Sequence, residues 1–216
     1  MKKEDKSKKG RIFAIGEQII LGTLLGDGYF LKLADRGKNY KLSFTHCEEQ
    51  KKYALWKANK IKMPYFVYER ERYDKRTDKI YKSIDIQFKS DSIFKKYHEI
   101  LYVEGRKVVT LPALIQITPL AIAIWYCDDG NLYQNKDTNL LTLSIESFNN
   151  KEIIIDFFKR SFDINFKLCK NGAIRLTSKC EIKKFINLVK DYIPTSMLYK
   201  IDFKDYKIYK GRNYEK

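Results

Sequence analysis

The stretch Ile20-Leu-Gly-Thr-Leu-Leu-Gly-Asp-Gly28 decides the fold, together with a second copy, Ile122-Ala-Ile-Trp-Tyr-Cys-Asp-Asp-Gly130. Each is an apolar run that predicts a buried helix and ends in an Asp directly before a Gly. A Gly often ends a helix, which places Asp27 and Asp129 in the last turn, where the helix dipole disfavours an anion. A buried, unpaired carboxylate is costly. One such motif alone fits an ordinary helix with an Asp-Gly turn, but two in matched contexts indicate a shared positive partner, and a divalent cation is the obvious candidate.

The segments that follow the two motifs also correspond. Each motif is followed by a pair of strands, a helix, a second pair of strands and a further helix that begins at a polar cap, and one strand of each pair shows a clear match between the halves. The pairs are 40–45 with 140–146, 48–60 with 150–162, 83–88 with 173–177, and the helices that begin at Ser90 and Ser178. The chain therefore reads as one α-β-β-α-β-β-α unit written twice, which predicts an α+β protein with two related halves.

These residues resemble the two LAGLIDADG motifs of a single-chain homing endonuclease. Thr118-Pro-Leu-Ala-Ile-Ala-Ile-Trp-Tyr-Cys-Asp-Asp-Gly130 is similar to the second motif of the two-motif branch, and the resemblance extends to Gly105-Arg-Lys-Val-Val-Thr-Leu-Pro112 and Ile193-Pro-Thr-Ser-Met-Leu-Tyr-Lys200. It implies two pseudo-symmetric αββαββα halves, each with an antiparallel sheet that forms part of a DNA-binding saddle, joined at the paired motif helices. The expected divisions are a basic flexible tail (1–11), an N-terminal half (12–115) and a C-terminal half with an aromatic and basic tail (116–216).

In such a pair of helices, Gly22 and Gly26 lie four residues apart on one face and allow another helix to approach closely. The second helix has Ile124 and Asp128 at the equivalent positions, so the contact between the halves is expected to be asymmetric.

The composition indicates a polyanionic partner. The chain has 43 Lys and Arg against 27 Asp and Glu, a net charge of +16, which favours nucleic acid over an acidic membrane surface but does not separate DNA from RNA. Cys47, Cys127, Cys169 and Cys180 show no metal-site spacing and predict reduced, mostly buried thiols of an intracellular protein, in a bacterial cytoplasm or an organelle. His46 and His98 are too far apart in the sequence to suggest a metal cluster. Neither a membrane span nor a signal peptide is expected.

The alternating strands place polar side chains on one face of each expected sheet. A solvated antiparallel sheet shows the same alternation, and the family resemblance favours contact with the DNA major groove. The candidate DNA-binding residues are Lys32, Arg36, Lys41, Ser43, Thr45, Arg70, Arg72, Ser83, Asp85, Gln87, Lys89, Thr142, Ser144, Glu146, Lys167, Arg175 and Thr177.

The resemblance also assigns the catalytic residues. It brings Asp27 and Asp129 together at the base of the motif helices, where they share about two or three Mg²⁺ ions, with Mn²⁺ as a substitute. Gly26 and Asp128 complete the candidate metal set, although Asp128 also fits a residue of the helix contact. Lys200 matches an active-site lysine. Lys107 is the best counterpart in the first half, although its spacing to Pro112 departs from the family pattern, and the alternative for both lysines is an ordinary surface cation.

The expected function is a metal-dependent double-strand break in DNA at a long asymmetric target, with short 3′ overhangs, made by a monomer that supports mobility of an intron. Two alternatives stay open: an RNA-binding intron maturase, and a DNA-binding protein of this fold that has lost cleavage. Retention of both Asp27 and Asp129 argues against the second alternative. A free-standing enzyme fits better than an intein, because the chain shows no splicing-block residues.

Overall fold

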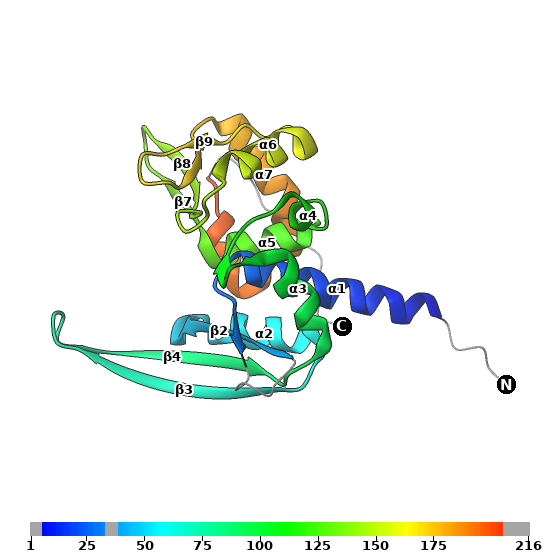
Figure 1. Cartoon of the computed structure of the whole chain (residues 1–216). Helices are drawn as coiled ribbons and strands as arrows, with labels where there is room; N and C mark the ends of the chain where they lie inside the picture. The colour runs from blue at the N-terminus through cyan, green and yellow to red at the C-terminus, as the bar shows by residue number, and fades with distance from the viewer. Residues whose placement is uncertain (1–5, 33–38, 205–216) are drawn as a thin grey trace.

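The computed structural model describes residues 6–32 and 39–204. Its centre is a pair of helices, α1 (Lys6–Leu25) and α5 (Pro119–Asp129), which lie side by side with one lobe of the molecule on each side of them (Figure 1). The sheets of both lobes lie toward the same side of this helix pair, the left side in Figure 1.

The two lobes are built in the same order. The N-terminal lobe adds β1 (Tyr29–Lys32), β2 (Tyr40–Cys47), η1 (Glu48–Gln50), α2 (Lys51–Ile61), β3 (Tyr65–Asp74), β4 (Lys79–Phe88) and α3 (Ser92–Leu101). The C-terminal lobe adds β7 (Gly130–Gln134), β8 (Asn139–Leu143), α6 (Lys151–Phe162), β9 (Lys167–Leu168), β10 (Ile174–Leu176) and α7 (Lys179–Val189). The remaining short elements are β5 (Tyr102–Val103), β6 (Arg106–Lys107), α4 (Leu111–Leu114), η2 (Lys190–Tyr192) and η3 (Thr195–Ile201).

Sheet topology confirms the repeated unit. The first sheet has the strand order β1-β2-β4-β3 and the second has β7-β8-β10-β9, with every pairing antiparallel. An α+β fold with two four-stranded antiparallel sheets was predicted, and the prediction is confirmed.

Several boundaries differ from those expected. Helix α1 begins at Lys6, so it takes in part of the basic tail expected at 1–11. Helix α3 is capped by Asp91 rather than Ser90, because the Asp91 carboxylate accepts the free N–H of Ile93 at 2.9 Å. Strands β8 and β10 are short, which leaves the expected strand residues 144–146 and 177 beyond their ends. The rest of the expected tail (1–5), the loop at 33–38 and the C-terminal tail at 205–216 lie outside the described residues.

Close contact between α1 and α5 depends on the two glycines of the first motif. A Cβ atom on Gly22 would lie 2.4 Å from the carbonyl oxygen of Ala121 and 2.7 Å from Cβ of Ile124. A Cβ on Gly26 would lie 2.5 Å from Cβ of Asp128. The glycines therefore form notches that receive the larger side chains of α5, which explains why only the first motif needs them.

The other end of the helix pair is fixed by hydrogen bonds from Gln18. Its side-chain oxygen accepts the backbone N–H of Thr118 at 2.7 Å and the Thr118 hydroxyl at 2.9 Å. Its side-chain nitrogen donates to the carbonyl oxygen of Gln116 at 2.8 Å. Gln18 thus satisfies backbone groups at the start of α5, where Thr118 caps the helix and Pro119 begins it.

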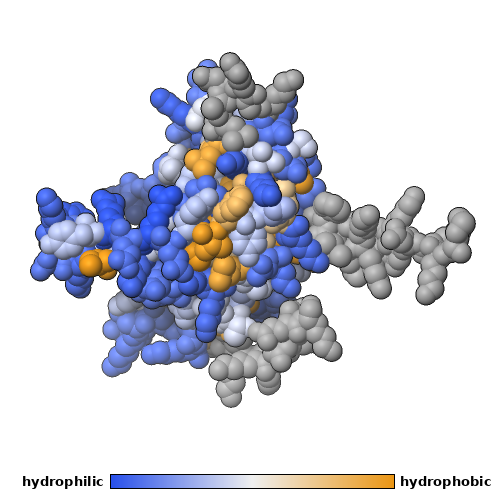
Figure 2. Space-filling model, turned by 90° about the horizontal axis from the view of Figure 1, so that it is seen from below, coloured by the Kyte–Doolittle hydropathy of each residue, from blue (hydrophilic) through white to orange (hydrophobic). Residues whose placement is uncertain are grey.

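The apolar residues that alternate with the polar ones along the strands are all buried, as alternation predicts: Leu42, Phe44, Ile84, Ile86, Phe88, Leu143, Ile145, Ile174 and Leu176. Strands β3 and β4 have 10 residues each and project as a hairpin beyond the body, whereas β9 has 2 and β10 has 3 (Figure 1). Hydrophilic residues cover most of this hairpin in the view from below (Figure 2). The two lobes therefore present sheets of unequal length.

All four cysteines are free thiols. Cys127 is buried, but Cys47 and Cys180 are exposed, so the expectation of mostly buried thiols is wrong for these two. None of the described helices is both long and apolar enough to cross a membrane.

The close fit at Gly22 predicts that Gly22→Ala strongly destabilises the folded protein. We expect it to lower the free energy of unfolding by about 3 kcal/mol, because the new methyl group must displace backbone of α5. Gly16→Ala is the control: its Cβ would meet the Ile61 carbonyl oxygen at 3.1 Å, and the gain in helix propensity offsets that small shift. Urea unfolding measures both, and equal losses would contradict the notch.

Candidate active site

Asp27 and Asp129 lie at the same end of the helix pair. Asp27 follows α1 in a turn with 39% of its side chain exposed, and Asp129 is the last residue of α5. Burial, and then the charge of Asp128, raises the pKa of Asp27 to about 6. Burial, and then the charges of Asp27 and Asp128, raises the pKa of Asp129 to about 7. These carboxylates repel one another in a partly buried site, which is the electrostatic setting that a cation relieves.

Lysines from outside the motif helices hold the two motif turns. Lys107 Nζ donates to the carbonyl oxygens of Gly26 at 2.9 Å and Gly28 at 2.8 Å. Lys200 Nζ donates to the carbonyl oxygen of Gly130 at 2.9 Å. Each lysine therefore contacts the glycine that directly follows a motif Asp. The two lysines have matched positions in the structure, although the sequence spacing around Lys107 departs from the family pattern.

The side chain of Asp128 faces the N-terminal lobe. Its carboxylate oxygens lie 2.9 and 3.0 Å from Lys57 Nζ, and one of them accepts the Tyr53 hydroxyl at 2.7 Å. The backbone N–H of Asp27 also points to it at 3.4 Å. The Asp128 and Lys57 side chains are both fully buried, and the Lys57 ammonium lies 4.3 Å from the centre of the Phe44 ring. This buried ion pair ties α5 of one half to α2 of the other.

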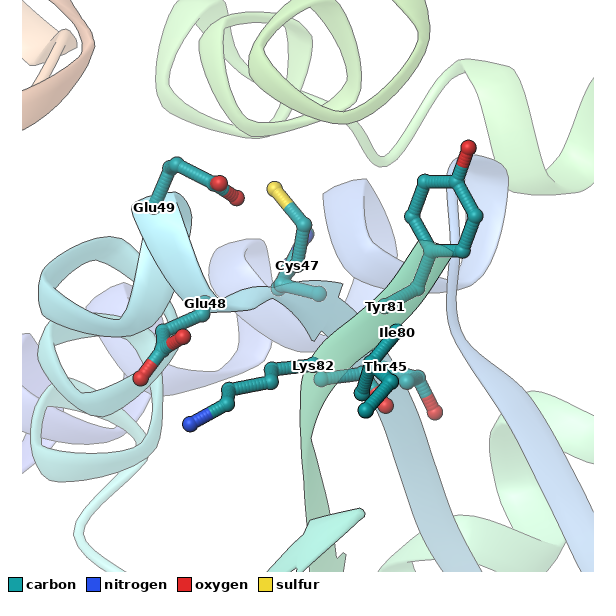
Figure 3. A pocket seen from close by; sticks show the side chains of 9 residues that line it. Thr45, Cys47, Glu48, Glu49, Ile80, Tyr81 and Lys82 are labelled. Atoms are coloured by element: carbon teal, nitrogen blue, oxygen red, sulfur yellow. The ribbon is translucent and has the colours of Figure 1, made fainter. Parts of the chain in front are cut away.

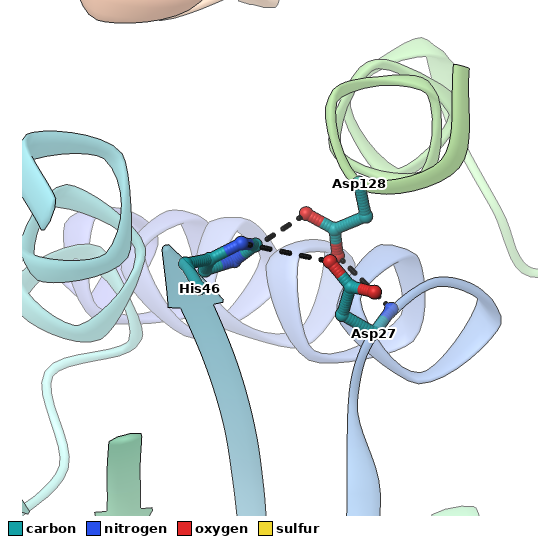
Figure 4. Close-up of side chains that lie close together, drawn as sticks. All are labelled: Asp27, His46 and Asp128. Carbon is teal, nitrogen blue, oxygen red and sulfur yellow. Dashed lines mark hydrogen bonds and ion pairs between the residues drawn. The ribbon is translucent and has the colours of Figure 1, made fainter. Parts of the chain in front are cut away.

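His46 lies beside Asp27 and Asp128 and faces both carboxylates, as Figure 4 shows. Its Nδ1 is 3.5 Å from an Asp27 oxygen and 3.1 Å from the Gln50 side-chain oxygen, and its Nε2 is 3.7 Å from an Asp128 oxygen. Burial, and then the charge of Lys57, lowers the pKa of His46 to about 4, so the imidazole is neutral at pH 7. His46 thus belongs to the carboxylate cluster, although the two histidines of the sequence did not suggest one.

Asp27, His46 and Asp128 could offer a metal ion three ligand atoms that lie within 4.8 Å of one another. The Lys57 ammonium already neutralises Asp128, however, and repels a second cation at that carboxylate. Of the four residues predicted to hold metal, Asp27 and Asp129 have carboxylates that no buried lysine contacts directly among the described residues. The carbonyl oxygen of Gly26 is engaged by Lys107.

Comparison with known proteins identifies the family. Residues 17–185 match the LAGLIDADG DNA endonuclease family. The chain belongs to this family. It is 28% identical over 219 residues to the "Probable intron-encoded endonuclease 1" of Wickerhamomyces canadensis, covering 93% of this chain and 90% of that protein. The predicted membership in the single-chain, two-motif branch is therefore confirmed.

Solved structures show the same LAGLIDADG fold. The homing endonuclease I-WcaI bound to its DNA recognition sequence aligns with a TM-score of 0.76 and 24% identity, covering 94% of this chain and 95% of that one. The N-terminal LAGLIDADG domain of DUF199/WhiA aligns with a TM-score of 0.50 and 12% identity, covering 93% and 98%.

Most of the candidate DNA-binding residues have side chains that reach solvent. Those that are exposed or partly exposed are Lys41, Thr45, Arg70, Arg72, Ser83, Gln87, Lys89, Thr142, Ser144, Glu146, Lys167, Arg175 and Thr177. Ser43 and Asp85 differ from the others, because both are buried although alternation places them on the outer face of the first sheet. Lys32 ends β1, and Arg36 lies outside the described residues.

A hollow borders the outer face of the first sheet, between the end of β2 and the start of β4 (Figure 3). Its lining includes Thr45 from the sheet and the carboxylates of Glu48 and Glu49. These two carboxylates outnumber the one lysine of the lining, Lys82, which disfavours a phosphate in the hollow, and neither Asp27 nor Asp129 lines it.

Sequence reasoning missed Lys57, Tyr53 and His46. The signal that could have found Lys57 is its position on α2, whose buried residues are Tyr53, Ala54, Lys57, Ala58 and Ile61. These lie at helical spacing on one face, so Lys57 is a charge within an apolar stripe and requires a buried anion. Which anion it meets depends on the packing of the two LAGLIDADG halves.

The neighbouring residues Asp128 and Asp129 are expected to affect stability in opposite directions. Asp128→Asn leaves the Lys57 ammonium buried without a counter-charge and should cost on the order of 3 kcal/mol. The pKa of Asp129 is raised on folding, so its ionised form destabilises the protein increasingly as pH rises from about 4 to about 7. Asp129→Asn should therefore raise Tm at pH 8, and by less at pH 5.

Thermal unfolding with a chelator at pH 5 and pH 8 measures both effects. If Asp128→Asn and Asp129→Asn shifted Tm in the same direction at pH 8, the separate roles assigned to these carboxylates would be contradicted.

Proposed function

We propose that this chain is a site-specific DNA endonuclease that makes a double-strand break. The observation that carries the proposal is the pair of half-buried carboxylates, Asp27 and Asp129, each beside a glycine whose carbonyl oxygen is held by a lysine. One such unit lies at the base of each half. Two such units suit the hydrolysis of two DNA strands, one strand for each half of the protein. The two cuts together would leave short 3′ overhangs.

The family and its relatives support this proposal. A relative that aligns along nearly the whole chain carries a name that describes an intron-encoded endonuclease, and a similarly folded protein was solved with its DNA recognition sequence. We infer a role in the mobility of an intron. The unequal sheets favour a long, asymmetric target over a palindromic one, because β3 and β4 reach much farther than β9 and β10.

A divalent ion fits Asp27 and Asp129. Their raised pKa values show that negative charge is destabilised there, and the Asp27 carboxylate is open to solvent on one side. Mg²⁺ prefers a few carboxylates together with water and substrate oxygens, which matches one aspartate from each half. When bound, such ions activate water and neutralise charge at the phosphate. We propose about two or three ions shared by the pair, with Mn²⁺ as a substitute.

The lysines supply the remaining positive charge. Lys107 and Lys200 hold the backbone next to each Asp, and their positive charges act to lower the pKa of both Asp27 and Asp129. Burial lowers the pKa of Lys107, and the three nearby aspartates oppose that shift. We propose that each lysine stabilises charge near one scissile phosphate or polarises the attacking water.

Cleavage of a random duplex library tests the proposal. The wild-type protein should enrich one long site, cut with Mg²⁺ and left intact with chelator. Asp27→Asn and Asp129→Asn should each lose double-strand cleavage while binding of that site persists, because the sheets are unchanged. Linearised product from either variant would remove the role assigned to that carboxylate. Absence of any cut product from folded wild-type protein that binds intron RNA would favour the maturase instead.

Binding of the selected site should depend steeply on salt. If about six or more phosphates are contacted, affinity should fall by roughly 10³ between 50 and 200 mM monovalent salt, because each contact releases counterions. A gel-shift titration with chelator present measures this without cleavage. A flat salt response would argue against an extended contact with the duplex.

A further inference from the structure

Asp85 is a buried carboxylate on the face of the first sheet that we assign to DNA. It lies in the middle of β4, directly opposite Thr45 of β2 and Tyr68 of β3. The residue is only 1% exposed, although Arg70 beside it is an exposed side chain. Burying a carboxylate is costly unless hydrogen bonds compensate it, so its surroundings must be arranged around its charge.

Three side chains donate hydrogen bonds to this carboxylate. Oδ1 accepts from the Thr45 hydroxyl at 2.7 Å. Oδ2 accepts from Arg70 Nη2 at 2.7 Å and from Gln87 Nε2 at 3.1 Å. The Ser43 hydroxyl lies 3.5 Å from Oδ1, but its one proton has a closer acceptor in the Ile86 carbonyl oxygen at 3.1 Å. An ionised carboxylate can only accept, so each of its three partners turns a donor toward it.

This constraint fixes what each neighbour offers to a ligand above the sheet. Gln87 uses one hydrogen of its NH₂ group on Asp85, which sets the orientation of the amide and keeps its carbonyl oxygen available as an acceptor. The Thr45 hydroxyl proton also points inward, which leaves its oxygen as an acceptor. Arg70 uses one nitrogen and has 62% of its side chain exposed, so the rest of its guanidinium remains a donor.

We propose that Asp85 is a specificity-determining positioning residue for DNA. It presents Arg70 as a donor fork, which suits the O6 and N7 acceptors of guanine in the major groove. It presents Gln87 and Thr45 as acceptors, which suit the amino groups of cytosine or adenine. The inference rests on the proposed DNA endonuclease function and adds which base chemistry the first sheet reads.

Among the described residues, the second sheet has no buried carboxylate of this kind. Asn131, Thr142 and Arg175 lie in line across the second sheet as Tyr29, Ser43 and Gln87 do across the first. Two residues before Arg175, where the first half has Asp85 two residues before Gln87, lies the buried Ala173. Arg175 is paired in register with Thr142 of β8, and no carboxylate among the described residues is recorded as its hydrogen-bond or ion-pair partner. The arrangement of donors and acceptors by a buried anion is therefore a property of the N-terminal half.

Simple electrostatics predicts the opposite effect of removing this charge. Loss of a negative charge beneath a DNA-binding face should strengthen binding to any duplex. Our proposal instead requires that Asp85→Asn weaken binding to the selected target, because the amide of Asn can donate and leaves Arg70 and Gln87 without a fixed orientation.

The experiment compares Asp85→Asn with Glu69→Gln. Glu69 is the exposed neighbour of Arg70 on β3, pairs with Lys51, and loses the same unit of charge when changed to Gln. Affinity for the wild-type target and base preferences from library selection are measured with chelator, so that no strand is cut. We expect Asp85→Asn to lose about tenfold in affinity and the preference at one short block of positions. Glu69→Gln should keep the wild-type preferences.

The outcomes separate the two proposals. A wild-type protein that selects no site overturns the endonuclease function and this inference with it. A wild-type protein that selects a site, with identical preferences for Asp85→Asn, overturns this inference alone. If Asp85→Asn does not fold, Arg70→Lys replaces it, because Lys keeps the charge but lacks the fork. Unchanged base preferences in Arg70→Lys would then overturn the inference.

Discussion

The close approach of α1 and α5 is the constraint on which the rest of the structure depends. Gly22 and Gly26 leave room for Ile124 and Asp128, so the two helices pack with almost no space for a further atom. Gln18 fixes one end of this contact and the Lys57–Asp128 pair fixes the other. Asp27 and Asp129 both lie at the C-terminal ends of these two helices, so the packing of the helices brings the two aspartates to one site.

The candidate active site contains three neighbouring carboxylates that differ in their electrostatic surroundings. Asp128 receives a fully buried ammonium and a hydroxyl, and it becomes part of the contact between the halves. Asp27 and Asp129 receive no such direct partner among the described residues, and burial together with mutual repulsion raises their pKa values. The lysines at the motif turns bind backbone carbonyl oxygens instead, which leaves both carboxylates available for a cation.

A buried carboxylate also orders its neighbours on the first sheet. Asp85 lies on a face that alternation alone marks as solvent-exposed, yet the side chains of Thr45, Arg70 and Gln87 cover it. In both places a buried acid orders the donors around it. The two LAGLIDADG halves therefore share a topology but differ in their polar chemistry, which is consistent with a protein that binds a target without internal symmetry.

The sequence by itself determined the repeated αββαββα unit, the family, the buried faces of the strands and the pair Asp27 and Asp129, because these depend on local periodicity and on motifs within one half. It also suggested that Gly22 and Gly26 allow close packing. Only the tertiary structure decided that Lys57 neutralises Asp128, that His46 joins the carboxylates, and that Asp85 is buried. The physical reason is that each of these facts depends on which side chains from separate strands or separate halves meet, and local sequence patterns carry no information about such distant partners.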